Sequence, residues 1–183
     1  GVTDNVADSE EEAFAQIKQF LSYMPQSVYE LTLRKGIGDP IDRKEEDLLS
    51  IIPKDRQKSY EMREIIRKVF DKDSFFEMTK SFGRGIITGF ARLDGFSVGI
   101  LANDSNFYAG SMSADGARKT TRFVKLCGTF HIPIVSLVDE PGFLIGPEAE
   151  LEGTILHGTE AVLAVTESNV PWSSVMIRKS FGV

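Results

Sequence analysis

Hydrophobic and polar positions along this chain follow a helical period in some segments and a strand period in others. Near the start, Ser9 precedes three glutamates, and apolar residues then recur every three or four positions as far as Leu21. A hydroxyl followed by acidic residues and this spacing predicts an amphipathic helix that ends near Pro25. The same spacing from Met62 onward, after Ser59, predicts a second helix.

The segment between these two helices, residues 24–52, has no sustained period. It combines prolines and glycines with a charged run at residues 39–47. Such punctuation is typical of loops, so we interpret the segment as a connecting arm.

The period changes after the second helix. Residues 85–92 and 96–102 form two runs rich in β-branched and aromatic side chains, and Asp94-Gly95 joins them. This dipeptide favours the left-handed backbone of a type I′ turn. The two runs are therefore predicted to form a β-hairpin.

Downstream of the hairpin, helical and strand patterns alternate. The predicted elements are, in order, a helix from Ser113, a buried strand at residues 132–138, a loop at 142–153, a helix that begins near Gly158 and a strand at 172–178. Strand, helix, strand, helix and strand in succession predict right-handed βαβ crossovers and a layered α/β core. Because the alternation stops after a strand, and because Gly1 stands in place of a methionine, we expect a fragment whose core is incomplete at the C-terminal end.

Composition narrows the class of protein. The 183 residues are 42% hydrophobic and 26% charged, without an apolar run long enough to span a bilayer, so a membrane protein is not expected. The net charge of -6 argues against a nucleic-acid partner. A single cysteine, Cys127, and two histidines offer neither a disulfide nor a zinc-ligand set, which favours a reducing compartment and no metal.

Two segments are candidate sites. The apolar, glycine-bounded loop after Asp139 follows the carboxyl end of a strand, where open α/β sheets bind ligands. Farther along, the predicted start of a helix offers the N–H groups of Gly158 and Thr159 as oxyanion donors. A surface turn that packs on the core and an ordinary helix start are the simpler interpretations of these residues.

Side-chain catalysts are harder to find. Asp139 and Glu140 are adjacent on a strand, so they point to opposite faces and a turn-stabilising or helix-capping role is expected. Neither His131 nor His157 has a partner nearby in sequence, and for His157 we expect a supporting hydrogen bond rather than proton transfer. Cys127 lies on an apolar stripe and is predicted to be a small core residue. These residues do not name a reaction.

Several segments in chain order match one known family. They are residues 1–7, 21–25, 39–43, 60–66, 89–95, 98–103 and 132–135, and most specifically Val-Asp-Glu-Pro-Gly-Phe-Leu-Ile-Gly at 138–146, Gly-Thr-Ile-Leu-His-Gly at 153–158, Thr-Glu-Ser-Asn-Val-Pro at 166–171 and Arg-Lys-Ser-Phe-Gly at 178–182. Each segment alone is a weak signal, but together they cover nearly the whole chain. The chain resembles the C-terminal half of the carboxyltransferase (beta) subunit of biotin-dependent acyl-CoA carboxylases of the acetyl-/propionyl-CoA carboxylase type.

This resemblance implies a crotonase-like (ClpP/crotonase) α/β fold with repeated strand-helix units. Residues 1–52 would be the tail of the N-terminal half with the connecting arm, and residues 53–183 the C-terminal carboxyltransferase domain, truncated at its end. In the family, a carboxyl group moves from carboxybiotin to the α-carbon of a short-chain acyl-CoA such as acetyl-CoA or propionyl-CoA.

The resemblance also implies a site without a metal. An apolar biotin pocket that excludes water would be formed by Gly142, Phe143, Leu144, Ile145 and Gly146. The main-chain amides of Gly158 and Thr159 would be the catalytic donors, although alanine is common in relatives at the second position. Because biotin itself takes the α-proton in the usual mechanism, the lack of a side-chain base agrees with this interpretation.

The implied cofactor and partners follow from the same reaction. They are carboxybiotin on a carrier protein or domain, a coenzyme A thioester as substrate, a biotin carboxylase, and further copies of the subunit in dimers or a hexamer, in the cytoplasm or in the mitochondrial matrix. Two alternatives remain open, namely a biotin-dependent acyl-CoA decarboxylase subunit and a fragment that is only an inactive docking or assembly domain. A coenzyme A hydratase or isomerase would need carboxylates over its substrate, which the sequence does not provide.

Overall fold

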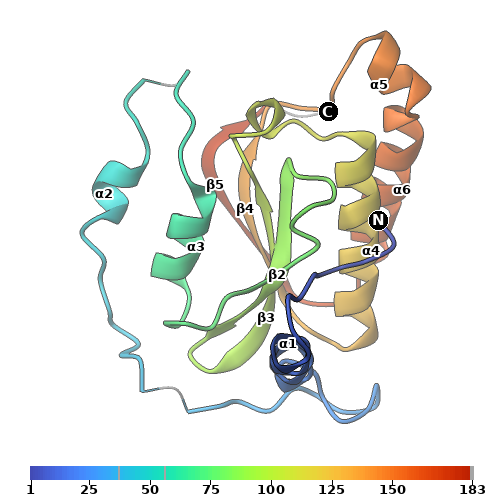
Figure 1. Cartoon of the computed structure of the whole chain (residues 1–183). Coiled ribbons are helices and arrows are strands. Elements are labelled where there is room, and N and C mark those ends of the chain that lie inside the picture. The colour runs from blue at the N-terminus through green and yellow to red at the C-terminus, as the bar shows by residue number, and fades with distance from the viewer. Residues whose placement is uncertain (37, 56, 182–183) are drawn as a thin grey trace.

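The computed structural model describes residues 1–36, 38–55 and 57–181, and these residues build one five-stranded sheet in the order β1-β2-β3-β4-β5 (Figure 1). The strands are β1 (Phe76–Met78), β2 (Ile86–Leu93), β3 (Phe96–Asn103), β4 (Ile134–Glu140) and β5 (Trp172–Ser180). The first three pair antiparallel, whereas β4 and β5 extend the sheet in parallel. The sheet is therefore mixed.

The predicted hairpin is formed by β2 and β3. Asp94 and Gly95 have positive φ angles of 50° and 79°, as a type I′ turn requires. The carboxylate of Asp71 accepts hydrogen bonds from both turn amides, at 3.0 Å from Asp94 and 2.8 Å from Gly95. The prediction of a hairpin is confirmed, and Asp71 satisfies the two amides of its turn.

Helices cover both faces of the sheet. On one face lies α3 (Met62–Val69), and on the other lie α4 (Ala114–Thr129) and α6 (Thr154–Thr166) (Figure 1). The connection from β3 to β4 runs through α4, and the one from β4 to β5 includes α6, so the predicted succession of strands and helices is confirmed. Fully buried side chains fill both layers of the core. On one face, Met62 and Ile66 of α3 pack with Ile100 of the sheet; the other layer contains Val124 and Cys127 of α4 with Phe90 and Ile134 of the sheet.

Capping residues define the helix starts. Ser9 accepts the Glu12 amide at the start of α1 (Glu10–Ser22), and Ser113 accepts the Gly116 amide at the start of α4, as the sequence predicts. At α3, Glu61 is the N-cap rather than Ser59. The second helix is thus confirmed, but its cap was assigned two residues too early.

Three other features differ from the prediction. The three-residue strand β1 was not predicted, since it is too short to show a period. Within the loop at 142–153, Pro147 begins the short helix α5 (Pro147–Leu151). The helix predicted to start near Gly158 begins at Thr154, because Gly153 has a left-handed backbone (φ 74°) and its carbonyl accepts the His157 amide.

The N-terminal segment packs into the layer under α4. Tyr23 is 3% exposed, and its ring stacks against Phe90 with centroids 5.8 Å apart. The buried guanidinium of Arg92 donates to the carbonyl of Ser22 at 2.6 Å and lies over the Tyr23 ring. Residues around Tyr23 therefore belong to the core on this face of the sheet.

The described parts of the predicted arm, residues 24–36 and 38–52, run from α1 past the end of the sheet towards α3 on the opposite face (Figure 1). Its regular structure within the described residues is the single turn α2 (Leu48–Ile51). Arg43 fastens the arm to the end of α3 by donating to the carbonyls of Lys68 at 3.0 Å and Phe70 at 2.8 Å. A second short helix, η1 (Tyr108–Gly110), follows β3.

Across the described ranges, no helix combines the length and the apolar character that a bilayer span requires.

Candidate functional site

The candidate loop leaves the carboxyl end of β4 and is held against the segment before α4. The amide of Met112 donates to the Gly142 carbonyl at 3.0 Å, and the Leu144 amide donates to the Met112 carbonyl at 2.9 Å. Phe143 and Met112 thereby pair as a parallel bridge. The loop has a defined backbone although it lies outside the sheet.

The five predicted biotin-binding residues differ in exposure. Gly142, Phe143, Leu144 and Gly146 are half-buried, whereas the side chain of Ile145 is 90% exposed. Gly142 and Gly146 have φ angles of 128° and 115°, which residues with a Cβ rarely adopt. The glycines set the path of the loop, and Ile145 is its exposed apolar side chain.

The structure brings this loop and the predicted donor pair together. The ring of Phe143 lies directly on Gly158 of α6, where a Cβ would be only 2.6 Å from two ring carbons. A side chain at position 158 would therefore displace the ring. Gly158 has a packing role that the sequence did not reveal, since Phe143 lies 15 residues earlier in the chain.

The main-chain donors lie deeper in the helix than the sequence predicted. Because α6 begins at Thr154, Gly158 and Thr159 are in its second turn, where amides face the carbonyls four residues earlier. The Thr159 hydroxyl also donates to the Ile155 carbonyl at 2.9 Å. The first-turn amides without intrahelical partners belong to Thr154, Ile155 and Leu156. The assumed helix start was wrong, and the donor role of Gly158 and Thr159 stays a prediction.

Asp139 is fully buried at the base of the loop and has several partners. Its carboxylate accepts from Tyr60 Oη at 2.8 Å, Arg178 Nη2 at 3.1 Å and the Lys179 amide at 3.0 Å. Burial, followed by the hydrogen bond to Asp139, raises the pKa of the Tyr60 hydroxyl, which stays a neutral donor. The turn or cap role expected for Asp139 is wrong, since this network ties β4 to β5 and to the segment before α3.

Glu140 points to a different partner from its neighbour. Its Oε2 lies 3.4 Å from the Asn103 amide nitrogen, and burial raises the pKa of the carboxyl group. Asn103 also accepts the main-chain amide of Asp139 at 3.1 Å. The side chains of Asp139 and Glu140 bind separate groups, so the pair does not converge as a general acid and base.

Both histidines have defined partners. His131 Nε2 lies 2.9 Å from the Val28 carbonyl, at the arm. His157 contacts Arg118 of α4 and Glu160 of its own helix, three residues later, so the expectation that it has no partner nearby in sequence was wrong. Cys127 is fully buried, which raises the pKa of its thiol, as expected for a core cysteine. In the described part of the chain, no cluster of three or more His, Cys, Asp or Glu side chains is placed to hold a metal ion.

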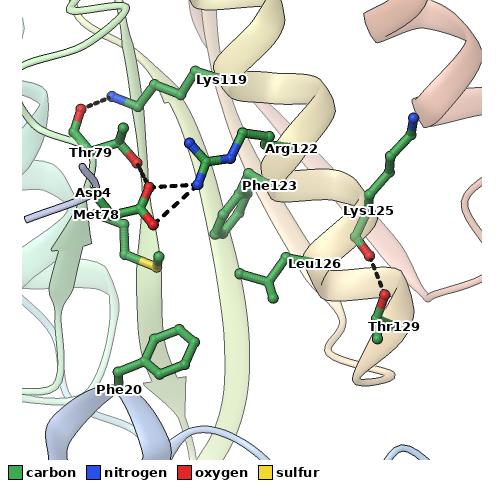
Figure 2. Close-up of a pocket in the computed structure, with 10 residues that line it drawn as sticks. All are labelled: Asp4, Phe20, Met78, Thr79, Lys119, Arg122, Phe123, Lys125, Leu126 and Thr129. Carbon is green, nitrogen blue, oxygen red and sulfur yellow. Dashed lines mark hydrogen bonds and ion pairs between the residues drawn. The ribbon is translucent and has the colours of Figure 1, made fainter. Parts of the chain in front are cut away.

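A separate cavity of about 350 Å³ lies between α4 and the N-terminal segment, away from the loop (Figure 2). Its cations are largely committed: Arg122 pairs with Asp4 at 3.0 Å, and Lys119 Nζ donates to the carbonyls of Thr79, Phe82 and Ile86. Burial lowers the pKa of Lys119 to about 8. The Lys125 side chain points away from these groups (Figure 2). This cavity is a seam between two segments of the fold.

The chain belongs to the carboxyl transferase family, since the model of the carboxyl transferase domain matches residues 1–183. It is 39% identical over 182 residues to the propionyl-CoA carboxylase carboxyltransferase subunit of Haloferax mediterranei. It is also 37% identical over 182 residues to the methylmalonyl-CoA decarboxylase subunit alpha of Veillonella parvula. These alignments cover 100% of this chain but 35% and 36% of the relatives, so the chain spans about a third of their length.

Solved structures agree with the family. Transcarboxylase 12S, described as a hexamer with methylmalonyl-coenzyme A and methylmalonic acid bound, matches with a TM-score of 0.90 and 34% identity over 94% of this chain and 34% of that one. A single-chain, multi-domain long-chain acyl-CoA carboxylase matches with a TM-score of 0.84 and 28% identity over 96% of this chain and 17% of that one. The predicted crotonase-like fold is confirmed.

Proposed function

We propose that this chain forms the carboxybiotin side of a biotin-dependent acyl-CoA carboxyltransferase, which transfers a carboxyl group to the α-carbon of acetyl-CoA or propionyl-CoA. The family match over residues 1–183 is the observation that supports the proposal most strongly. The ordered apolar loop at the carboxyl end of β4 supplies the binding site, with residues 142–146 against the biotin rings.

The residues present fit such a ligand. Ile145 offers an exposed apolar side chain for the ring system, and the backbone beside it is fixed by the two hydrogen bonds to Met112. Bound carboxybiotin supplies the activated carboxyl group and a nitrogen that accepts the substrate α-proton. The loop excludes water from that carboxyl group, and main-chain N–H groups of α6 stabilise negative charge on the ureido oxygen. For Gly158 and Thr159 to be the donor pair, their amides must turn from the carbonyls of Thr154 and Ile155, which they face in the second turn of α6.

The proposal extends to partners. Carboxybiotin arrives on a carrier protein or domain that a biotin carboxylase loads, and the acyl-CoA half of the site belongs to a longer subunit. Apolar side chains exposed along α6 fit an oligomer of dimers or a hexamer; they are Ile155, Leu156, Val162, Leu163 and Val165, each 39–64% exposed. We place the assembly in the cytoplasm or the mitochondrial matrix, in line with the single buried thiol.

A second candidate is the reverse transfer, from an acyl-CoA to biotin. The similarity to the decarboxylase subunit of Veillonella parvula supports this second candidate. The two directions use the same groups of this chain, so only an assay separates them.

The test measures carboxyl transfer from carrier-linked carboxybiotin to acetyl-CoA and to propionyl-CoA by the full-length subunit. Transfer to one or both substrates supports the proposal and reports the chain-length preference. Carboxylation of free biotin from methylmalonyl-CoA, without forward transfer, would favour the decarboxylase. Inactivity in both directions with the fold intact would leave a docking or assembly domain as the better account.

A further inference from the structure

Helices α4 and α6 are joined near the candidate loop by a polar contact between side chains 39 residues apart. Arg118 Nη2 lies 2.7 Å from Nε2 of His157. On its other side, His157 Nδ1 lies 2.9 Å from Glu160 Oε2. Arg118 also forms an ion pair within α4, where its Nη1 lies 3.1 Å from Asp115 Oδ1. The imidazole is mostly shielded, with 17% of its side-chain surface exposed, so its partners rather than water satisfy it.

The partners determine the protonation state of the imidazole. A guanidinium is always charged and has only donors. Nε2 must therefore accept from Arg118, which leaves the ring neutral with its proton on Nδ1, where it is donated to Glu160. In water the opposite tautomer of a free imidazole prevails. The geometry thus selects one tautomer of a neutral histidine.

The contact lies where the loop meets the helix. His157 directly precedes Gly158, on which the ring of Phe143 packs. The loop is also held by Met112, which lies just before α4. Phe143 therefore packs on Gly158 only as long as α4 and α6 keep their relative position. The Arg118–His157 hydrogen bond joins the two helices one residue before Gly158.

We propose that His157 is a positioning residue whose Nε2, as the acceptor for Arg118, holds α6 against α4 and so fixes the loop at residues 142–146. Loss of this acceptor removes the hydrogen bond between the two helices, so the surface on which Phe143 packs is loosened.

Two substitutions separate the two ring nitrogens. In His157→Gln, the side-chain carbonyl reaches the position of Nε2 and can accept from Arg118. In His157→Asn, the shorter amide reaches only the position of Nδ1 and loses Arg118. Arg118→Met removes the donor from the other helix. The proposal therefore predicts that the Asn and Met variants behave alike and that the Gln variant resembles the wild type.

Hydrogen–deuterium exchange of the peptide covering residues 141–153 in the full-length subunit tests this at one pH, about pH 8. The Asn and Met variants should exchange about tenfold faster than the wild type in this peptide, the size expected when a hydrogen bond to a charged group is lost. The Gln variant should exchange like the wild type. The hairpin peptide at residues 86–103 is the control and should not respond. Equal loop exchange in the Gln and Asn variants would refute the proposal.

The consequence for catalysis rests on the proposed function. In carboxyl transfer, the Asn variant should raise the KM for carboxybiotin about tenfold with little change in kcat, and the Gln variant should keep the wild-type KM. If exchange responds as predicted but no transfer occurs in any variant, the positioning role stands and the proposed reaction fails. If transfer occurs but the loop does not respond, the positioning role fails alone.

Discussion

The contact between Phe143 and Gly158 predicts the effect of one added methyl group on stability. In Gly158→Ala, the added methyl would lie 2.6 Å from the Phe143 ring, so the ring must move by about 0.8 Å to restore an ordinary 3.4 Å contact. Overpacking of this kind costs about 1–3 kcal/mol, whereas alanine in a helix interior is favoured over glycine by about 1 kcal/mol. The net change in the free energy of unfolding should be a destabilisation of about 0–2 kcal/mol.

Gly128→Ala is the matched control. Gly128 is also helical, in α4, but a Cβ there would meet its nearest neighbour, Asn169 Oδ1, at 3.8 Å. Without a clash, alanine should stabilise the subunit by up to about 1 kcal/mol. Urea denaturation should therefore separate the two variants by about 1–3 kcal/mol. Phe143→Leu should relieve the clash, so that the double variant with Gly158→Ala is less destabilised than the sum of the single ones. Equal stabilisation by both alanines, or additive effects in the double variant, would refute the packing argument.

Three other predictions concern buried charge. Asp139→Asn breaks the ion pair with the 7%-exposed Arg178 side chain and should lower the free energy of unfolding by about 3 kcal/mol. Transfer activity per folded subunit should fall far less than the ~10²–10⁴-fold typical of a lost acid or base. A collapse of activity at unchanged stability would contradict this prediction. Glu140→Ala should likewise keep most activity, and a loss of that size would expose a missed catalyst. The pKa of Lys119 is lowered from 10.5 to about 8, so above pH 8 the folded state releases the proton first and stability rises with pH. The stability of wild type minus Lys119→Met, measured by urea denaturation, should therefore increase by roughly 2 kcal/mol from pH 8 to pH 10, and a flat difference would refute the lowered pKa.

Local signals explain which parts of the fold could be predicted. Ser9, Ser113 and Asp94-Gly95 act within a few residues of themselves, and the elements that they start or turn were found. The strand β1 and the helix α5 are too short to show a period, and their pairing or packing is decided elsewhere in the chain. The start of α6 was misplaced because Gly158, required by Phe143, was taken for a helix-start glycine when Gly153 has that role.

The candidate site was found in part. The loop after β4 followed from its position at a strand end, which is a general property of α/β sheets. Three partners of Asp139 and His157 could not be predicted, because Tyr60, Arg178 and Arg118 are 39–79 residues away in sequence and only the folded chain brings them near. Glu160 lies only three residues after His157, so this partner was within reach of a helical-spacing argument. The resemblance to a family supplied the reaction, which no single side chain here indicates.

The buried Tyr23 and the long exposed arm have a consequence for how the chain can be divided. Phe20 and Tyr23 pack on one face of the sheet, and the arm that follows crosses to the other face, where Arg43 fastens it. The arm therefore links the two faces covalently, and its residues 26–33 are mostly exposed. A protease cut within residues 26–33 should leave two pieces that stay associated through Tyr23, Phe90 and Arg92. The domain would then be a natural candidate for fragment complementation, with its N-terminal helix supplied in trans.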